Sequence, residues 1–192
     1  MVKPLIRIAL SLAALLTVPC VAEQSQHMAI TFDDLPVHTS VDKSLAERQR
    51  ITGDIIQAIV TRQIEAVGFV NERQLYPDSE LDTDRLALLL AWIDARLELG
   101  NHSYSHPDLH RTDLDEFKED VLRGEKNIRP LLTAAGMQLR WFRHPYLHTG
   151  RDLTTKTDLE AFLQKRGYAI APVSIDNQEW IFARAYDLAL QT

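Results

Sequence analysis

Short apolar, β-prone runs alternate with helical segments along most of this 192-residue chain. The expected strands cover residues 28–32, 66–70, 97–99, 139–142 and 168–175. Helices are expected at 45–62, 112–128 and 158–165. A further helix should begin after a cap at Asp82 or Thr83, and its apolar run at 86–93 should be deeply buried. Pro130 should kink or break the third helix. Alternation of this kind predicts parallel β/α units and the α/β fold class.

The number of units limits the architecture. A closed (β/α) barrel has eight units and commonly ~200 residues or more, whereas five strand signals are present before Thr192. Either the barrel is open or the sequence is a C-terminally truncated fragment, and we favour the fragment. We expect one domain at 23–192, because 45% hydrophobic residues can supply a single substantial core.

Polar residues follow four of the expected strands. Asp33 and Asp34 follow the first, His102 follows the third, Arg143 follows the fourth, and Asp176 follows the fifth. Because parallel strands end at the same edge of a sheet, these side chains are expected to meet there. That edge carries the active site in barrels of this kind.

The residue types at this edge are typical of a metal site. His102 and His106, four residues apart, can face the same side of a helical or turn-like segment. With one aspartate they would bind a zinc-like ion and leave positions for water and substrate, while the other aspartate accepts a proton. The alternatives are loop histidines and a solvated Asp-Asp turn. Arg143 could neutralise a buried carboxylate either as structure or to hold a catalytic base.

Charge and the N-terminal segment bear on partners and location. The formal net charge of -6, without a Lys/Arg cluster, argues against a nucleic-acid partner. Residues 1–22 read as a signal peptide, with Lys3 and Arg7, an apolar run at 8–18, and the small residues of 20–22 before the cleavage site. The apolar run is short for a membrane span, although an uncleaved anchor is the alternative. We therefore expect a secreted, periplasmic or cell-surface protein without stable membrane insertion, and a monomer.

Four motifs together resemble the polysaccharide deacetylase family, which is the fourth carbohydrate esterase family and contains the chitooligosaccharide deacetylase homology domain. The motifs are Thr31-Phe32-Asp33-Asp34, His102-Ser103-Tyr104-Ser105-His106-Pro107, Arg143-His144-Pro145-Tyr146 and Asp176-Asn177-Gln178-Glu179-Trp180. The chain departs from the family pattern at His144, where many members have proline, and at Glu179, which replaces an aspartate. The resemblance extends from about Ile30 to Trp180.

The resemblance implies a distorted, incomplete (β/α) barrel and a specific division of roles. Asp34, His102 and His106 would bind one divalent metal ion, with zinc expected and cobalt, nickel or manganese open. Asp33 would be the catalytic base and Arg143 would orient it. The backbone N–H of Tyr146 would bind the oxyanion, and Asp176 would pair either with Arg143 or with the general acid.

The implied activity is that of a hydrolase acting on carbon–nitrogen bonds other than peptide bonds. It would remove N-acetyl groups from an amino-sugar polysaccharide such as peptidoglycan or chitin. O-acetyl ester hydrolysis and a catalytically silent carbohydrate-binding domain are the alternatives. The family's fifth motif, a Leu-x-His that supplies the general acid, has no match before Thr192.

Several other aromatic and histidine residues remain ambiguous. His148 could serve as the acid or could be an exposed loop histidine, and Trp180 could line a sugar groove or belong to the core. His110 is expected in a surface loop. We assign Trp92 and Trp141 to packing, and we expect no role for His27 or His38.

Overall fold

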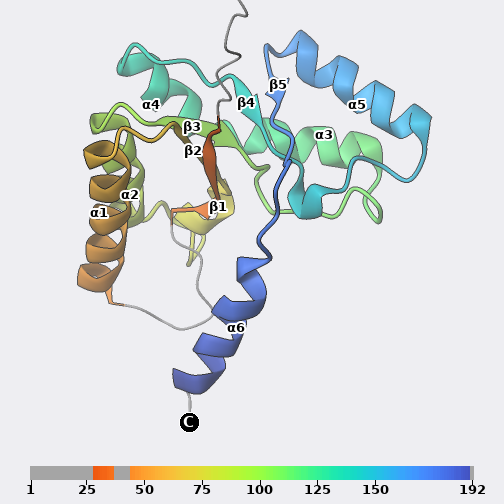
Figure 1. Cartoon of the computed structure of the whole chain (residues 1–192). Helices are drawn as coiled ribbons and strands as arrows, with labels where there is room; N and C mark the ends of the chain where they lie inside the picture. The colour runs from red at the N-terminus through yellow and green to blue at the C-terminus, as the bar shows by residue number, and fades with distance from the viewer. Residues whose placement is uncertain (1–27, 37–43, 191–192) are drawn as a thin grey trace, which may run out of the picture.

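One sheet of five parallel strands organises the chain (Figure 1). The computed structural model describes residues 28–36 and 44–190. The strands pair in chain order and are β1 (Ile30–Leu35), β2 (Ala66–Val70), β3 (Glu98–Asn101), β4 (Trp141–Phe142) and β5 (Ala169–Ile170). All four pairings are parallel, so the predicted α/β class and strand direction are confirmed.

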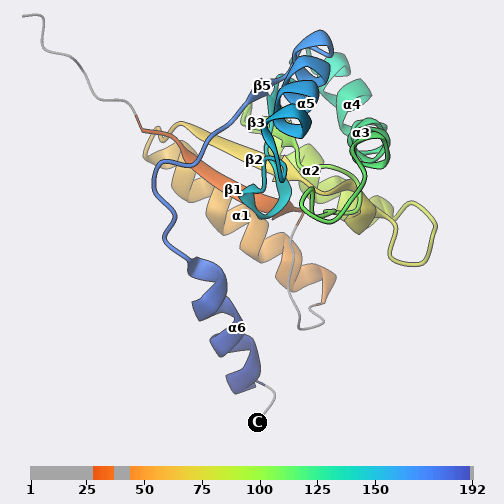
Figure 2. The same ribbon diagram turned by 90° about the vertical axis from the view of Figure 1, so that its right-hand side faces the viewer.

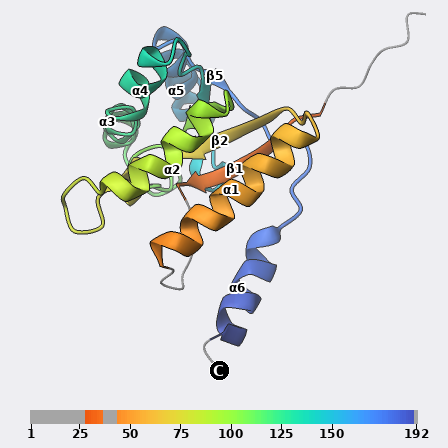
Figure 3. The same cartoon turned by 90° about the vertical axis from the view of Figure 1, so that its left-hand side faces the viewer.

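Helices and short turns lie between the strands, and one helix follows the last strand. They are α1 (Leu45–Thr61), α2 (Thr83–Asp94), α3 (Leu114–Arg123), α4 (Ile128–Ala134), α5 (Leu153–Lys165) and α6 (Glu179–Leu190), with the 3-10 turns η1 (Glu72–Leu75) and η2 (Pro145–Leu147). Helices α1 and α2 lie side by side next to β1 and β2, whereas α3, α4 and α5 group toward β4 and β5 (Figures 2 and 3). Helix α6 projects away from the sheet in the same views, and none of its residues is buried.

Side-chain caps define where four of the helices begin. Ser44, Asp82, Asp113 and Asp152 each accept a backbone N–H from the first turn of α1, α2, α3 and α5 respectively. These bonds satisfy donors that have no partner inside the helix. Asp152 therefore starts α5 five residues before the expected helix at 158, which corrects that boundary.

The expected helix at 112–128 is wrong in its continuity. It divides into α3 and α4, and the break falls at Gly124 and not at Pro130. A Cβ on Gly124 would lie 2.5 Å from the carbonyl carbon of Ser103, so only glycine allows α3 to end so close to the loop that follows β3. Pro130 lies in the first turn of α4, where its missing N–H removes no helical hydrogen bond.

The last expected strand is also much shorter than predicted. Only Ala169 and Ile170 of the run 168–175 pair with β4, and residues 174–180 are exposed. An apolar, β-branched run becomes a strand only where a neighbouring strand offers hydrogen bonds. In the described part of the chain, β4 itself contributes only Trp141 and Phe142.

Strand β1 runs through both aspartates instead of ending before them. Its pairing with β2 is irregular between Phe32 and Leu35, and Asp34 has a φ of 58°. In a regular strand, consecutive side chains point to opposite faces, and a bulge changes that direction. The irregularity allows two adjacent carboxylates to reach the same end of the sheet.

The core lies between the sheet and its helices. Its largest buried side chains include Trp92, Phe69, Phe117 and Phe142. Of the run 86–93, Leu88, Leu89, Trp92 and Ile93 are buried, whereas Leu90 is exposed, so the expectation of deep burial throughout this run is wrong. Trp92 packs as predicted, and Trp141 is half-buried against Arg140.

Some sequence expectations fall outside the described residues. The signal peptide at 1–22, His27 and His38 are among them. Within the part that is described, no helix has both the length and the apolar character needed to cross a bilayer.

Candidate metal and catalytic site

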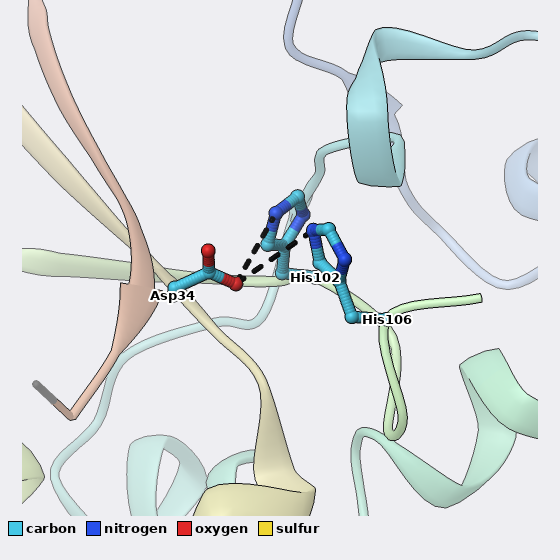
Figure 4. A group of neighbouring side chains, drawn as sticks. All are labelled: Asp34, His102 and His106. Atoms are coloured by element: carbon cyan, nitrogen blue, oxygen red, sulfur yellow. Dashed lines mark ion pairs between the residues drawn. The ribbon is translucent and has the colours of Figure 1, made fainter. Parts of the chain in front are cut away.

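The three predicted ligands meet at the carboxyl end of the sheet (Figure 4). Asp34 comes from β1, and His102 and His106 come from the loop after β3. The Oδ1 atom of Asp34 lies 3.8 Å from Nε2 of His102 and 3.7 Å from Nε2 of His106. One ligand atom from each of the three residues lies within 4.8 Å of the other two. This arrangement can enclose one small cation.

The orientation of the buried His102 ring supports the same arrangement. Its Nδ1 lies 2.9 Å from the backbone carbonyl oxygen of Arg143, and an N–H at Nδ1 would donate to that oxygen. The lone pair is then on Nε2, which is the nitrogen that faces Asp34. Metal-binding histidines commonly use a carbonyl in this way to fix their tautomer. Two imidazole nitrogens and a carboxylate oxygen are a donor set that suits zinc and similar ions.

Side-chain carboxylate and amide oxygens fasten the loop that carries the two histidines. Asp120 of α3 accepts hydrogen bonds at 2.8 Å from the backbone N–H groups of Tyr104 and Ser105, and at 2.7 Å from the Ser105 hydroxyl. Asn101 accepts the Ser103 N–H at 2.6 Å. Asn101 adjoins the histidine motif in sequence, but nothing in the sequence connects Asp120 to it.

His106 has a left-handed backbone conformation. Its φ is 58°, and its backbone N–H donates to the Ser103 hydroxyl at 3.0 Å. The two histidine rings lie edge to face, with centroids 4.8 Å apart. The segment is therefore a turn and not a helix, and the histidines meet through the hydrogen bonds of that turn.

The second aspartate lies beside the ligand group and against an arginine. Asp33 Oδ2 is 3.5 Å from Nη1 of Arg143 and 4.0 Å from Nε2 of His102. Arg143 is 3% exposed, and its Nη2 also donates to the Thr31 hydroxyl at 3.3 Å. Burial lowers the pKa of this guanidinium, and the Asp33 charge partly restores it. The pair thus holds Asp33 in one position while Asp34 faces the histidines.

Tyr146 covers one side of the ligand group. It has a φ of 56° and its ring packs edge to face on His106, with centroids 4.5 Å apart. A pocket of about 820 Å³ opens next to these residues, and its lining includes Asp34, His106, Tyr146, Tyr104 and Arg73. The predicted ligand site is therefore accessible from a hollow large enough for a sugar unit.

Two residues of the fourth motif do not join this group. Asp176 is exposed and accepts the backbone N–H of Gln178 at 2.9 Å, and among the described contacts none connects it to Arg143. Trp180 is 59% exposed on α6 and belongs neither to the core nor to the lining of the pocket. Both residues follow the short β5, beyond the point at which the chain stops following the sheet.

Comparisons with known proteins bear on the family and the fold. A family model described as polysaccharide deacetylase matches residues 21–162. Among solved structures, the peptidoglycan deacetylase PdaC from Bacillus subtilis is 19% identical, with 88% of this chain and 71% of that chain covered and a TM-score of 0.57. A family 4 carbohydrate esterase from Streptomyces lividans, in complex with acetate, is 20% identical over 85% and 71% of the two chains, with a TM-score of 0.56.

A third neighbour carries a different description. The CE4 family pseudoenzyme from Bacillus anthracis is 17% identical over 88% of this chain, with a TM-score of 0.59. This chain spans 52% of that structure, about half of its length. The structural likeness shows the fold alone, whereas the family model covers most of the chain. The resemblance first drawn from four short motifs is confirmed, and this chain belongs to the polysaccharide deacetylase family.

Proposed function

We propose that this protein is a metal-dependent hydrolase that removes N-acetyl groups from an amino-sugar polysaccharide. The observation that carries the proposal is the separation of the two adjacent aspartates. Asp34 faces His102 and His106, whereas Asp33 faces Arg143. A ligand carboxylate and a free carboxylate side by side are what hydrolysis at a metal site requires.

The residues of the chain divide the chemical work as follows. Asp33 accepts a proton from the attacking water, and the neighbouring guanidinium of Arg143 keeps the carboxylate oriented. The backbone N–H of Tyr146 donates to the oxygen that becomes negative as the acetyl carbonyl is attacked. A zinc-like ion on Asp34, His102 and His106 would supply Lewis-acid polarisation. Cleavage of the C–N bond releases acetate and an amine, which takes up a proton.

The substrate class follows from the pocket and from the family. The pocket beside Asp34 and His106 is lined by polar groups and by tyrosine rings, which suit hydroxyl-rich sugars. Relatives described as a peptidoglycan deacetylase and as a carbohydrate esterase support an acetylated glycan. The charged and apolar composition of residues 1–22 supports export, where such a glycan would be met.

Two other functions compete with this proposal. Hydrolysis of O-acetyl esters would use the same residues on a different bond. A silent carbohydrate-binding role is supported by the likeness to a CE4 family pseudoenzyme. The Asp33–Arg143 pair and the ligand group are all retained here, which favours an active hydrolase over the silent role.

Replacement of Asp33 by asparagine tests the proposal. The zinc-loaded Asp33→Asn variant should keep its metal and lose acetate release from chitooligosaccharides or peptidoglycan fragments by ~10²–10⁴-fold, since it lacks the base. Asp176→Asn makes the same chemical change at an exposed position outside the site and should retain most activity.

Three results would contradict parts of the assignment. Loss of zinc together with activity in Asp33→Asn would make Asp33 a ligand. Release of acetate from acetylated xylan alone would favour the O-acetyl esterase. No release from any of these glycans by the zinc-loaded wild-type protein would favour the silent carbohydrate-binding domain.

A further inference from the structure

A second group of metal-binding side chains lies outside the site described above. It consists of Asp108, His110 and His148, and one ligand atom from each lies within 4.8 Å of the other two. Asp108 and His110 belong to the loop that follows His106, and His148 ends η2, directly after Tyr146 and Leu147. The two loops that carry the second and third family motifs therefore meet at this group.

The backbone around the group is held in place by its own turn. Leu109 is 1% exposed and anchors the loop in the core between Asp108 and His110. The carbonyl oxygen of Asp108 accepts the N–H groups of Arg111 and Thr112 at 2.8 and 2.9 Å. On the other side, the His148 N–H donates to the Pro145 carbonyl oxygen at 3.1 Å. Both halves of the group are thus positioned by contacts that do not involve the three side chains.

The carboxylate of Asp108 already faces the imidazole of His148. Its Oδ1 lies 2.7 Å from Nδ1 of His148 and accepts the backbone N–H of His110 at 2.8 Å. Ligands around a tetrahedral zinc ion lie about 3.3 Å apart, given bonds of about 2.0 Å. A slight increase in the distance between Asp108 Oδ1 and His148 Nδ1 would therefore admit an ion in place of the hydrogen bond.

The two imidazoles of the group lie face to face. The rings of His110 and His148 are stacked with centroids 3.9 Å apart and an interplanar angle of 7°. An imidazole lone pair lies in the plane of its ring, so one of the two rings must rotate for both to bind the same ion through a nitrogen. Arg111 is a competing cation, because its Nε lies 3.6 Å from Asp108 Oδ2, and its side chain is 87% exposed. Such an exposed side chain can move into solvent when an ion binds.

We propose that Asp108, His110 and His148 form a second binding site for a zinc-like divalent ion, distinct from the group of Asp34, His102 and His106. The second site is the weaker of the two, because His148 is 38% exposed, against 2% for His102 and 20% for His106. The ring of His148 is 5.8 Å from that of Tyr146, which in turn packs on His106. An ion there would fasten η2 and Tyr146 to the loop that follows the first site.

The number of zinc ions bound per chain tests this proposal without reference to activity. Metal-free protein is dialysed against increasing concentrations of zinc chloride and analysed for bound metal. The wild-type protein should take up about two ions per chain, one tightly and one weakly. His148→Ala and His110→Ala should each weaken the second ion at least about ten-fold and leave the first unchanged. His106→Ala should remove the tight ion and leave the weak one.

Further variants keep the result interpretable. Asp108→Asn retains an oxygen for the His110 N–H but removes the ligand charge, and it should also lose the second ion even if His148→Ala loosens the turn. Arg111→Gln removes the competing cation and should strengthen binding of the second ion a few-fold. Asp115→Asn changes an exposed carboxylate at the start of α3 and should alter neither ion.

Two outcomes would overturn the proposal. One is saturation of the wild-type protein at a single ion per chain. The other is a second ion that persists in both His148→Ala and Asp108→Asn. Because every reading is bound zinc, failure here would leave the proposed deacetylase activity untouched, and failure of that activity would leave this site intact.

Discussion

At the scale of single residues, the site depends on where two neighbouring aspartates point. Asp33 and Asp34 would project to opposite faces of a regular strand. The irregular pairing after Phe32 and the φ of 58° at Asp34 instead direct one carboxylate to Arg143 and the other to the histidines. The chemistry we propose follows from this local departure from strand geometry.

His144 is the residue whose environment most changes its titration. It is 5% exposed, and burial lowers the pKa of its imidazole from 6.5 to about 4. Its buried Nδ1 has no hydrogen-bond partner among the described residues. The folded protein therefore contains a neutral imidazole at pH values where the unfolded chain would bind a proton.

Acid should consequently destabilise the metal-free protein through His144. The unfolded chain binds this proton as the pH falls through 6.5, whereas the folded protein binds it only near 4. The free energy of unfolding is therefore highest above pH 6.5 and decreases as the pH falls from 6.5 to about 4. The loss could reach about 3 kcal/mol. Urea unfolding of wild type and His144→Gln across this range should show a shallower pH dependence in the variant. Equal slopes would mean that His144 is protonated in the folded state.

At the scale of elements, buried carboxylates fasten helices to the loops beside the sheet. Asp120 of α3 binds the loop of the two histidines, and Glu72 of η1 binds the start of α4. Glu72 is fully buried and accepts the N–H groups of Asn127 and Ile128 at 2.8 Å each, and the Asn127 side-chain amide at 2.7 Å. Burial raises the pKa of Glu72, and these donors counteract that rise.

Removal of the Glu72 carboxylate should destabilise the fold measurably. Glu72→Ala leaves two buried backbone donors at the start of α4 without an acceptor, which costs about 1–3 kcal/mol or more. Glu72→Gln retains one oxygen and should cost less. Urea unfolding midpoints of the two variants provide the test, and an alanine variant as stable as wild type would show that water replaces the carboxylate.

At the scale of the whole molecule, the metal ligands connect segments that are distant in sequence. Asp34 lies in β1, whereas His102 and His106 follow β3. An ion held by all three binds the folded protein and not the unfolded chain. It therefore stabilises the fold by about 2.7 kcal/mol at a free concentration of 100 times its Kd.

Zinc should accordingly raise the melting temperature of metal-free wild-type protein by several degrees. His106→Ala, which removes a partly exposed ligand, should lose most of this rise. Magnesium is the matched control, because it prefers oxygen ligands and should have little effect. A full zinc response in His106→Ala would place the stabilising ion elsewhere.

The order of local patterns along the chain was sufficient to predict the parallel α/β fold and to bring the two aspartates, His102 and His106 together as candidates. Strand composition, helix caps and motif spacing are local properties, and they predicted the range of β2 without error. The histidine motif identified its ligands because their spacing is itself the signal. The family resemblance added the choice of Asp34 as the ligand and the roles of Asp33, Arg143 and Tyr146, and those roles stay predictions.

Contacts between distant segments decided what those local patterns could not. Strand length depends on the hydrogen bonds of a neighbour, so β5 is two residues long although its sequence is β-prone over eight. The break at Gly124 depends on the backbone of Ser103, and the meeting of His148 with Asp108 depends on two loops 40 residues apart. Such packing and pairing arise only in the folded chain, because the groups involved have no relation in sequence.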